Sequence, residues 1–195
     1  MELSNRIVVI TGGASGLGQA SSQYFIEQGA KVALFDLNEE QGQAYADELG
    51  EQARFFRVDV TNEDEVKRAI DAVKQQWGSI HICLNCAGIA PAGKPVSSNG
   101  ALALGQFATT ININLIGTFN VLRLAAEAMA ENELENGERG VIINTASVAA
   151  FDGQIGQAAY SASKAGVAGM TLPIARDLGP LGIRVNTIAP GVFNT

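Results

Sequence analysis

Stretches of apolar residues rich in β-branched side chains alternate along this chain with stretches whose apolar residues recur at helical spacing. The apolar stretches predict six strands, over residues 6–11, 31–36, 53–59, 79–86, 141–147 and 183–189. The amphipathic stretches predict five helices, over residues 16–28, 39–49, 63–77, 107–130 and 158–178. Strands that are apolar throughout are buried on both faces, and strands that alternate with helices pair in parallel through right-handed crossovers. The pattern therefore predicts an α/β fold, a doubly wound parallel sheet with helices on both faces.

The composition is typical of one globular domain. The chain has 195 residues, of which 47% are hydrophobic and 17% charged, so folding can remove about 70% of the unfolded surface from water. It contains no internal repeat, low-complexity tract or linker, which predicts a single domain over residues 1–195. The longest irregular connection is expected over residues 90–105, which are rich in glycine, proline, serine and alanine.

The charge of the chain argues against two classes of partner. The net charge is −7 and there is no basic run, so we expect neither a nucleic acid nor an anionic membrane surface as a partner. No apolar stretch reaches the roughly 18 residues that a membrane-spanning helix needs, and the first residues lack the pattern of a signal peptide. These features lead us to expect a cytoplasmic protein.

The cysteines and the histidine are interpreted as structural. Cys83 and Cys86 are the only cysteines, and their spacing is that of a C-x-x-C redox pair. They lie in a predicted strand, however, where positions three apart face opposite sides of the sheet, and no helix start follows directly to acidify a thiol. His81 is the only histidine and has too few partners to build a metal cage, so we predict no metal site.

A glycine-rich segment, Thr11 to Gly18, joins the first predicted strand to the first predicted helix. In a Rossmann-type fold such a loop brings the backbone close to a pyrophosphate, and the helix N-terminus supplies free amides and a partial positive charge. Asp36 ends the second predicted strand, where a carboxylate accepts hydrogen bonds from the adenosine ribose and repels a 2′-phosphate. Asp59 ends the third strand and is placed to meet the adenine amino group, with a solvated turn as the alternative. The sequence thus predicts dinucleotide binding, with NAD preferred over NADP.

Three polar residues predict acid–base chemistry. Tyr160 and Lys164 stand four positions apart, and Ser147 follows the apolar stretch 141–146. Positions four apart share one face of a helix, so an ammonium would lie beside a phenol whose ordinary pKa is about 10. A nearby positive charge favours the phenolate, which can serve as general base for the interconversion of a hydroxyl and a carbonyl. The arrangement therefore predicts proton transfer beside hydride transfer.

Five features together carry a resemblance to a known family. They are the glycine-rich loop, the segment Asn85-Cys86-Ala87-Gly88, Ser147, the Tyr160-x-x-x-Lys164 pair and the dipeptide Pro190-Gly191. In order and spacing they resemble the short-chain dehydrogenase/reductase family over essentially the whole chain. Residues 140–151 and 153–178 are similar, more narrowly, to its type 2 3-hydroxyacyl-CoA dehydrogenase group, also described as short-chain hydroxysteroid dehydrogenases. The resemblance implies an NAD-dependent enzyme of fatty acid metabolism that interconverts a secondary alcohol and a ketone, with 3-hydroxyacyl-CoA as the expected substrate.

The resemblance also implies roles for individual residues. Tyr160 is expected to be the acid/base, Lys164 to hold the phenolate and the nicotinamide ribose, and Ser147 to bind the substrate oxygen. Asn114 matches the family's helix asparagine, which supports a water in a proton relay; a packing role is the alternative. Gln157 is expected beside the substrate, or else in solvent. The residues expected to bind the cofactor are Gly12, Ser15, Gly16, Leu17, Gly18, Asp36, Asp59, Val60, Asn85, Ala87, Gly88, Tyr160, Lys164, Pro190, Gly191, Val192 and Thr195.

Two features depart from the family pattern. Residues 90–105 hold one basic residue, Lys94, where the acyl-CoA enzymes tend to carry more, so hydroxysteroid dehydrogenase and 3-oxoacyl reductase stay open as alternatives. The sequence ends at Thr195, so the resemblance implies that the family's C-terminal lid and seventh strand are absent. A non-catalytic dinucleotide-binding scaffold is the alternative from another class. The resemblance further implies a homodimer or homotetramer that pairs through the helices over residues 107–130 and 158–178.

Overall fold

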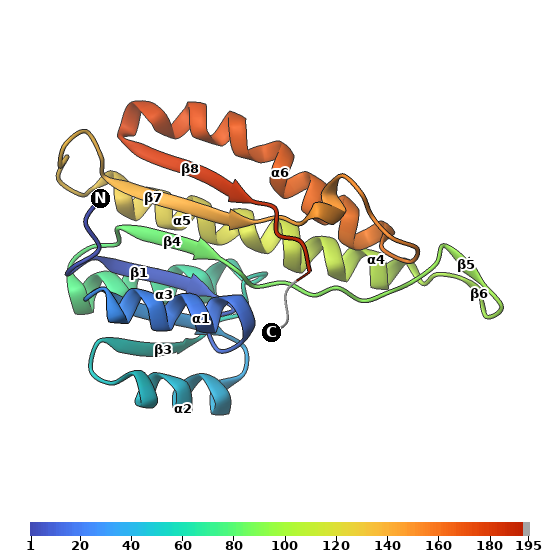
Figure 1. Cartoon of the computed structure of the whole chain (residues 1–195), viewed down its shortest axis with the longest axis horizontal. Coiled ribbons are helices and arrows are strands. Elements are labelled where there is room, and N and C mark those ends of the chain that lie inside the picture. Colours follow the sequence, from blue (N-terminus) through green and yellow to red (C-terminus); the bar gives the residue numbers. More distant parts are fainter. Residues whose placement is uncertain (193–195) are drawn as a thin grey trace.

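A six-stranded sheet lies between two layers of helices in the computed structural model, which describes residues 1–192 (Figure 1). The strands are β1 (Ile7–Thr11), β2 (Lys31–Asp36), β3 (Ala53–Arg57), β4 (Ile82–Asn85), β7 (Gly140–Thr145) and β8 (Ile183–Ile188). Their order is β3-β2-β1-β4-β7-β8, and every pairing is parallel. The chain changes direction across the sheet between β1 and β4, and open sheets of this kind collect ligands at the strand carboxyl ends beside that point. The prediction of a doubly wound parallel sheet is confirmed.

Helices cover both faces of the sheet. Their bounds are α1 (Gly16–Glu27), α2 (Glu39–Leu49), α3 (Glu63–Trp77), α4 (Leu104–Ile111), α5 (Thr118–Ala130) and α6 (Ala158–Leu178). Helices α1 and α2 pack on one face, whereas α3, α5 and the end of α6 pack on the other. Short π- and 3-10-helical turns lie at Asn112–Gly117 (η1), Val148–Ala150 (η2) and Gly179–Leu181 (η3). Among the described residues, no helix combines the length and the apolar character needed to cross a membrane.

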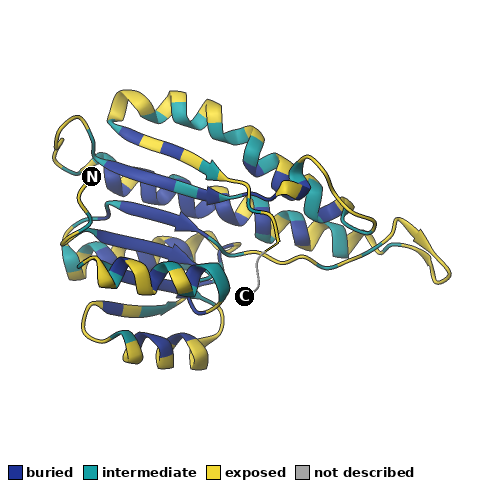
Figure 2. Ribbon diagram, in the orientation of Figure 1, coloured by how far each residue is buried: buried dark blue, intermediate teal, exposed yellow. Residues whose placement is uncertain are grey.

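The core consists of two apolar clusters separated by the sheet. The central strands contribute to both, because successive side chains of a strand point to opposite faces; Val8 and Ile10 belong to one cluster, and Ile7 and Val9 to the other. Figure 2 shows the central strands buried along nearly their whole length. This double burial explains the continuously apolar stretches of the sequence.

The two cysteines face opposite sides of the sheet, as their spacing predicts. Cys83 is fully buried in the cluster under α3 and α5, and Cys86 packs against the cluster under α1 and α2. Burial raises the pKa of Cys83 to about 12 and also raises the pKa of Cys86. His81 accepts a hydrogen bond at Nδ1 from the Ile7 amide at 3.1 Å, which is a structural role. In residues 1–192, no group of three His, Cys, Asp or Glu side chains could hold a metal ion.

The long helix predicted over residues 107–130 differs from the structure. It begins earlier, at Leu104, and it is interrupted by the π-helical turn η1 between α4 and α5. Directly after this turn the Thr118 hydroxyl donates to the Asn114 carbonyl at 2.7 Å, and the Asn114 side chain bonds to Ile89 in another segment. The π turn leaves no periodic signal in the sequence.

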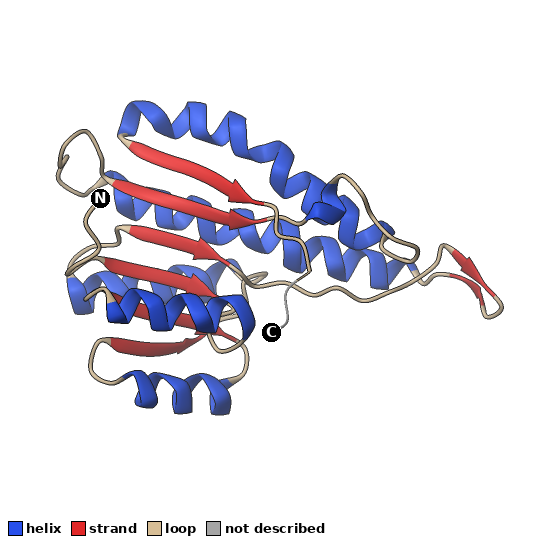
Figure 3. Ribbon diagram, in the orientation of Figure 1, coloured by secondary structure: helices blue, strands red, loops and turns tan. Residues whose placement is uncertain are grey.

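The connection predicted as irregular contains a small hairpin. Strands β5 (Val96–Ser97) and β6 (Gly100–Ala101) pair in antiparallel fashion. Figure 3 shows this hairpin projecting from the body of the molecule, beyond α4. The strands β3 and β4 also end earlier than predicted, because the chain leaves the sheet at Val58 and at Cys86 to form the walls of a cleft.

Candidate active site

A cleft of about 610 Å³ opens at the carboxyl ends of the strands on both sides of β1. Among the predicted cofactor residues, its lining contains Gly12, Ser15, Gly16, Leu17, Gly18, Asp36, Asp59, Val60, Ala87 and Gly88. It also contains residues that were not predicted to bind the cofactor, namely Phe35, Leu37, Val58, Thr61, Cys86, Ile89, Thr109, Asn112 and Ile113. Leu37 and Thr61 could have been found as neighbours of predicted residues, whereas the three from α4 and η1 carry no local signal.

The glycine-rich loop is folded too tightly for side chains. A Cβ on Gly12 would lie 2.9 Å from the Ala87 amide nitrogen, and a Cβ on Gly18 would lie 2.1 Å from the Gly12 carbonyl oxygen. Helix α1 begins directly after this loop. Its N-cap Ser15 makes no side-chain capping bond, and its first turn holds no acidic residue. The first amides of α1 therefore remain available to an anion, and the loop fits a pyrophosphate.

The Asp36 carboxylate is held in a fixed orientation at the rim of the cleft. Its Oδ2 accepts from the Ala14 amide at 3.2 Å, and its Oδ1 accepts from the Asn38 amide at 3.1 Å. The first bond ties β2 to the glycine-rich loop. A negative charge is thereby fixed where the ribose of a dinucleotide would lie in this fold.

Asp59 also lines the cleft, in the connection from β3 to α3. Its Oδ1 accepts from the amide and the hydroxyl of Thr61, at 2.9 and 2.7 Å. The Asp59 amide itself donates to Glu65 at 2.9 Å. The turn around Asp59 is therefore ordered by its own side chain and by α3, and the carboxylate lines the cleft rather than only solvent.

Thr11 is a supporting residue that the sequence analysis did not single out. It is buried at the end of β1, and its Oγ1 accepts from the amides of Cys86 and Ala87, both at 3.1 Å. These bonds hold the end of β4 beside the glycine-rich loop. Its position as the first residue of the glycine-rich segment could have indicated this supporting role.

A second cavity, of about 210 Å³, adjoins the cleft. It is lined by Leu17, Thr145, Ala146, Ser147, Tyr160, Pro190 and Gly191. Leu17 borders both spaces, so the second cavity lies next to the part of the cleft that Leu17 lines. The predicted tyrosine and serine thus meet in one small space, although they come from α6 and from the end of β7.

Lys164 lies beside this cavity on α6, one turn after Tyr160. Its side chain is buried, its Nζ donates to the Thr145 carbonyl at 2.7 Å, and its Nζ lies 5.8 Å from the Tyr160 ring centroid. Burial lowers the pKa of Lys164 to about 8. The lysine is therefore a desolvated cation held at the ring of the tyrosine, a setting typical of functional sites.

Ser147 has its oxygen oriented by the next turn of the chain. Its Oγ accepts from the Ala149 amide at 3.1 Å, as the N-cap of the 3-10 turn η2. Within residues 1–192 its own O–H makes no hydrogen bond, so the hydroxyl proton can be donated into the cavity. Together the three residues can bind an oxygen atom and exchange a proton with it.

The sequence matches the family described as short chain dehydrogenase over residues 6–195. The chain belongs to this family. It is therefore an oxidoreductase that acts on the CH–OH group of a small molecule, with a nicotinamide dinucleotide as cofactor. The predicted family resemblance is confirmed.

Several relatives of this short-chain dehydrogenase are named 3-hydroxyacyl-CoA dehydrogenase type-2. The one from Drosophila melanogaster is 55% identical and covers 99% of this chain and 77% of its own. The one from Homo sapiens is 53% identical and covers 97% of this chain and 74% of its own. The crystal structure of the Mycobacterium avium protein of that name is 45% identical, with a TM-score of 0.93, and covers 98% of this chain and 75% of its own. The crystal structure of NAD⁺-bound xylitol dehydrogenase is 32% identical, with a TM-score of 0.90, and covers 100% of this chain and 73% of its own.

Asn114 of this short-chain dehydrogenase is buried in the π turn η1 and uses its whole side chain internally. Its Oδ1 accepts from the Ile89 amide, and its Nδ2 donates to the Ile89 carbonyl, both at 2.8 Å. The Nδ2 also donates to the Ser163 hydroxyl at 3.0 Å. The side chain therefore links the segment after β4 to α6, next to Lys164. Asn114 lies at the predicted place, and its hydrogen bonds are those of the packing alternative.

Asn85 lines neither of the two cavities, and its contact with the cofactor stays a prediction. Its side chain is buried and donates to the Asn144 side chain at 2.9 Å, across the paired strands β4 and β7. At this position of β4 the side chain points to the face of the sheet that α3 and α5 cover. The bond therefore links the two strands near their carboxyl ends, beside the site.

Two further predicted residues, Val192 and Gln157, lie outside both cavities. Val192 is almost fully exposed and lines neither cavity, because the chain has left the sheet. Gln157 caps its own loop, accepting at Oε1 from the Gln154 amide at 2.9 Å, and its Nε2 remains available as a donor. Thr195 lies outside the described residues.

Proposed function

We propose that this short-chain dehydrogenase uses NAD to oxidise the 3-hydroxyl of a 3-hydroxyacyl-CoA to the 3-oxo group. The observation that carries the proposal is the meeting of Ser147 and Tyr160 in one cavity beside the dinucleotide cleft, with Lys164 Nζ 5.8 Å from the tyrosine ring. The names of the relatives that are 53–55% identical support this substrate class.

The residues of the larger cleft fit the cofactor. The glycine-rich loop and the open N-terminus of α1 would hold the pyrophosphate, and Asp59 and Val60 would border the adenine. Asp36 would accept hydrogen bonds from the adenosine ribose. Because its charge is fixed by two backbone amides, a 2′-phosphate would be repelled, which supports NAD over NADP.

The catalytic group handles the hydroxyl of the substrate. Ser147 donates a hydrogen bond to the substrate oxygen, which fixes the carbinol carbon toward the cleft. Tyr160, in its phenolate form, accepts the hydroxyl proton as the alcohol becomes a ketone. Lys164 holds the compensating positive charge and would contact the nicotinamide ribose. The chemistry that bound NAD would supply is a hydride acceptor beside the carbinol carbon.

The assay for this proposal is the absorbance of NADH in the presence of acetoacetyl-CoA, the reverse reaction. We expect NADH consumption that is faster than NADPH consumption. Binding of NADH without turnover of acetoacetyl-CoA or of a hydroxysteroid would contradict the proposed activity and favour a scaffold role.

We further propose that two copies pair through α5 and α6. A groove of about 300 Å³ between these helices is lined by Phe119, Leu122, Ala126, Ile174 and Leu178, among others. Phe119 and Leu181, which both line this groove, expose 46% and 41% of their surface, and large apolar side chains exposed on one face favour association. Light scattering at micromolar concentration tests this, and a monomeric mass would contradict it.

A further inference from the structure

Val60 lines the cleft that would hold the dinucleotide, and residues of η1 and α5 contact it. Asn120, buried on α5, donates from Nδ2 to the Val60 carbonyl at 2.9 Å. Gly117 lies three residues earlier, and a Cβ there would come within 2.6 Å of Val60 Cγ2. The start of α5 therefore packs directly against the segment that would border the adenine.

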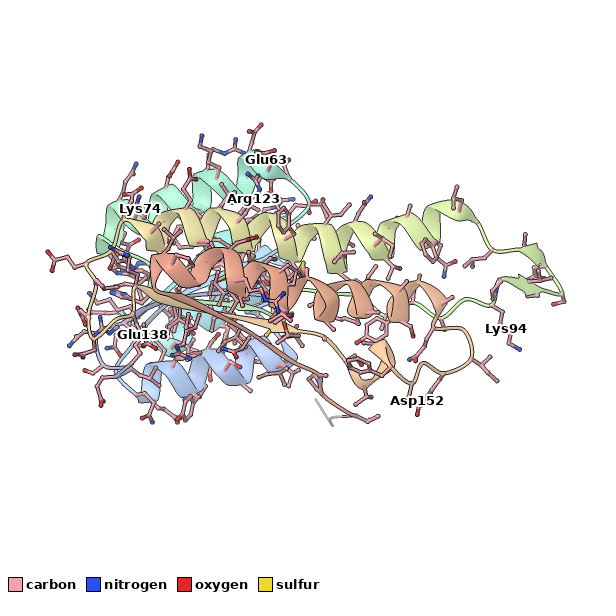
Figure 4. All side chains as sticks on the ribbon, turned by 90° about the horizontal axis from the view of Figure 1, so that it is seen from above. Glu63, Lys74, Lys94, Arg123, Glu138 and Asp152 are labelled. Carbon is pink, nitrogen blue, oxygen red and sulfur yellow. The ribbon has the colours of Figure 1, made fainter. Side chains whose placement is uncertain are left out.

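The orientation of the Asn120 amide is fixed by a second partner. Arg123 donates from Nη2 to Asn120 Oδ1 at 2.9 Å, and the same Nη2 pairs with Glu63 Oε1 at 2.7 Å. An arginine can only donate and a carbonyl can only accept, so a reversed amide would face two mismatched partners. Figure 4 shows Arg123 of α5 and Glu63 of α3 beside each other. Glu63, Arg123 and Asn120 thus form a continuous series of contacts that leads from the surface to Val60 at the cleft.

The hydrogen bond from Asn120 to Val60 comes from a different part of the chain than the other hydrogen bonds around Val60. The Val58 amide donates to the Asp36 carbonyl at 3.0 Å, and the Asp59 amide donates to Glu65, which are contacts within the β2–α3 unit. Asn120 comes from the segment that continues from α4 and η1, and Thr109, Asn112 and Ile113 of that segment line the cleft as well. The bond therefore sets the distance between two parts of the cleft lining.

We propose that Asn120 is a positioning residue for the adenosine half of the cofactor, acting through the Val60 backbone. The proposal rests on the dinucleotide binding proposed above. Asn120 itself does not line the cleft, so it would act on affinity by fixing the wall against which the adenine packs. The second cavity, around Ser147 and Tyr160, where the nicotinamide would lie, is not lined by Val60, Asn120 or Arg123.

The test is Asn120→Asp, which keeps the size of the side chain and the acceptor for Arg123 but loses the donor to Val60. We expect the Kd for NADH to rise about tenfold, the effect of one buried hydrogen bond. Reduced nicotinamide mononucleotide lacks the adenosine half, so kcat/KM for this truncated cofactor should not change. AMP, as a competitive inhibitor, should lose affinity together with NADH.

The matched control is Asn132→Asp. Asn132 also donates from Nδ2 to backbone carbonyls, of Ile80 at 2.7 Å and Arg139 at 2.9 Å, but it lies near the amino ends of β4 and β7. This variant should lose thermal stability and keep the NADH affinity of the parent protein. Arg123→Met provides a second test if Asn120→Asp does not fold, and it should raise the Kd for NADH by a smaller factor.

Unchanged NADH affinity in a folded Asn120→Asp protein would overturn the inference, as would unchanged affinity in Arg123→Met where only that variant folds. An equal loss for NADH and for the mononucleotide would also overturn it, because it would indicate a general structural role. Failure of the parent protein to bind NADH at all would instead contradict the proposed function.

Discussion

The Lys164 ammonium group lies 5.8 Å from the centre of the Tyr160 ring, and its Nζ donates to the carbonyl at the end of β7. This bond to Thr145 joins the helix that carries the acid–base pair to the strand that leads into Ser147. The proposed catalytic group is therefore fixed to the carboxyl end of the sheet, where the two cavities adjoin.

Replacing Tyr160 by phenylalanine removes the proposed proton acceptor and leaves the ring in place. We expect kcat to fall by about 10²- to 10⁴-fold, the usual contribution of general acid–base catalysis, with a much smaller change in NADH affinity, since the ring that borders the cofactor is kept. Steady-state kinetics with acetoacetyl-CoA and fluorescence titration of NADH measure the two quantities. Retention of full turnover in Tyr160→Phe would exclude the proposed role.

Lys164 should make the stability of the free protein depend on pH. Burial lowers its pKa from 10.5 to about 8, so between these values the unfolded chain binds more protons and stability rises with pH. Relative to Lys164→Met, which has no such group, the parent protein should gain on the order of 3 kcal/mol across this window. Urea unfolding of both proteins at the two ends of the window measures the difference. The raised pKa of Cys83 acts in the opposite direction, but equally in both proteins.

The comparison of Lys164→Met with the parent protein should also show that Lys164 lowers stability but supports activity. Below pH about 8 the buried charge destabilises the fold, so Lys164→Met should be the more stable protein there after allowance for the lost bond to Thr145. It should nevertheless lose most of its turnover. A stability difference that does not vary with pH would show that Lys164 titrates at its ordinary pKa.

Asp36→Asn removes the charge at the rim of the cleft but keeps the shape of the side chain. We expect the ratio of kcat/KM for NAD to that for NADP to fall about tenfold, because the repulsion of a 2′-phosphate is relieved. Asp47→Asn, which makes the same charge change at an exposed position of α2 outside both cavities, is the control. An equal change of the ratio in both variants would indicate a general charge effect.

His81 should destabilise the fold as the pH falls. Burial, followed by the charge of Arg6, lowers the pKa of His81 below its ordinary 6.5, while Glu135 acts in the opposite direction. The unfolded chain therefore takes up the proton first, and stability decreases as the pH falls below about 6.5. His81→Asn keeps an acceptor near the Ile7 amide without a titrating group, so its stability should depend less on pH. Thermal unfolding of both proteins between pH about 7.5 and 5 tests this.

Gly18→Ala should disrupt the cofactor loop because its Cβ would lie 2.1 Å from the Gly12 carbonyl oxygen. The neighbour is backbone, so the loop itself must shift, and we expect the Kd for NADH to rise at least tenfold. Gly105→Ala on α4 is the matched control, since a Cβ there meets no atom within 4 Å. If both variants bind NADH like the parent protein, the loop does not hold the pyrophosphate.

The main elements of the fold could be predicted from the sequence because they rest on local patterns. The bounds of α2, α3 and α6 agree with the periodicity of their apolar residues, and β2 ends at the predicted Asp36. The hairpin within residues 90–105 and the π turn at Asn112–Gly117 could not be predicted. The two strands of the hairpin are two residues long each, too short to show an alternating pattern, and the π turn does not change the period of the apolar residues around it.

The sequence by itself determined the order of strands and helices, the glycine-rich loop and the spacing of Tyr160 and Lys164, since residues a few positions apart meet in any helix or turn. Only the tertiary structure decided that Ser147 shares a cavity with Tyr160, that Asn85 faces the core and that Asn120 holds Val60. These relationships join residues from different helices and strands. They follow from the packing of helices on a twisted parallel sheet, and no local period encodes that packing.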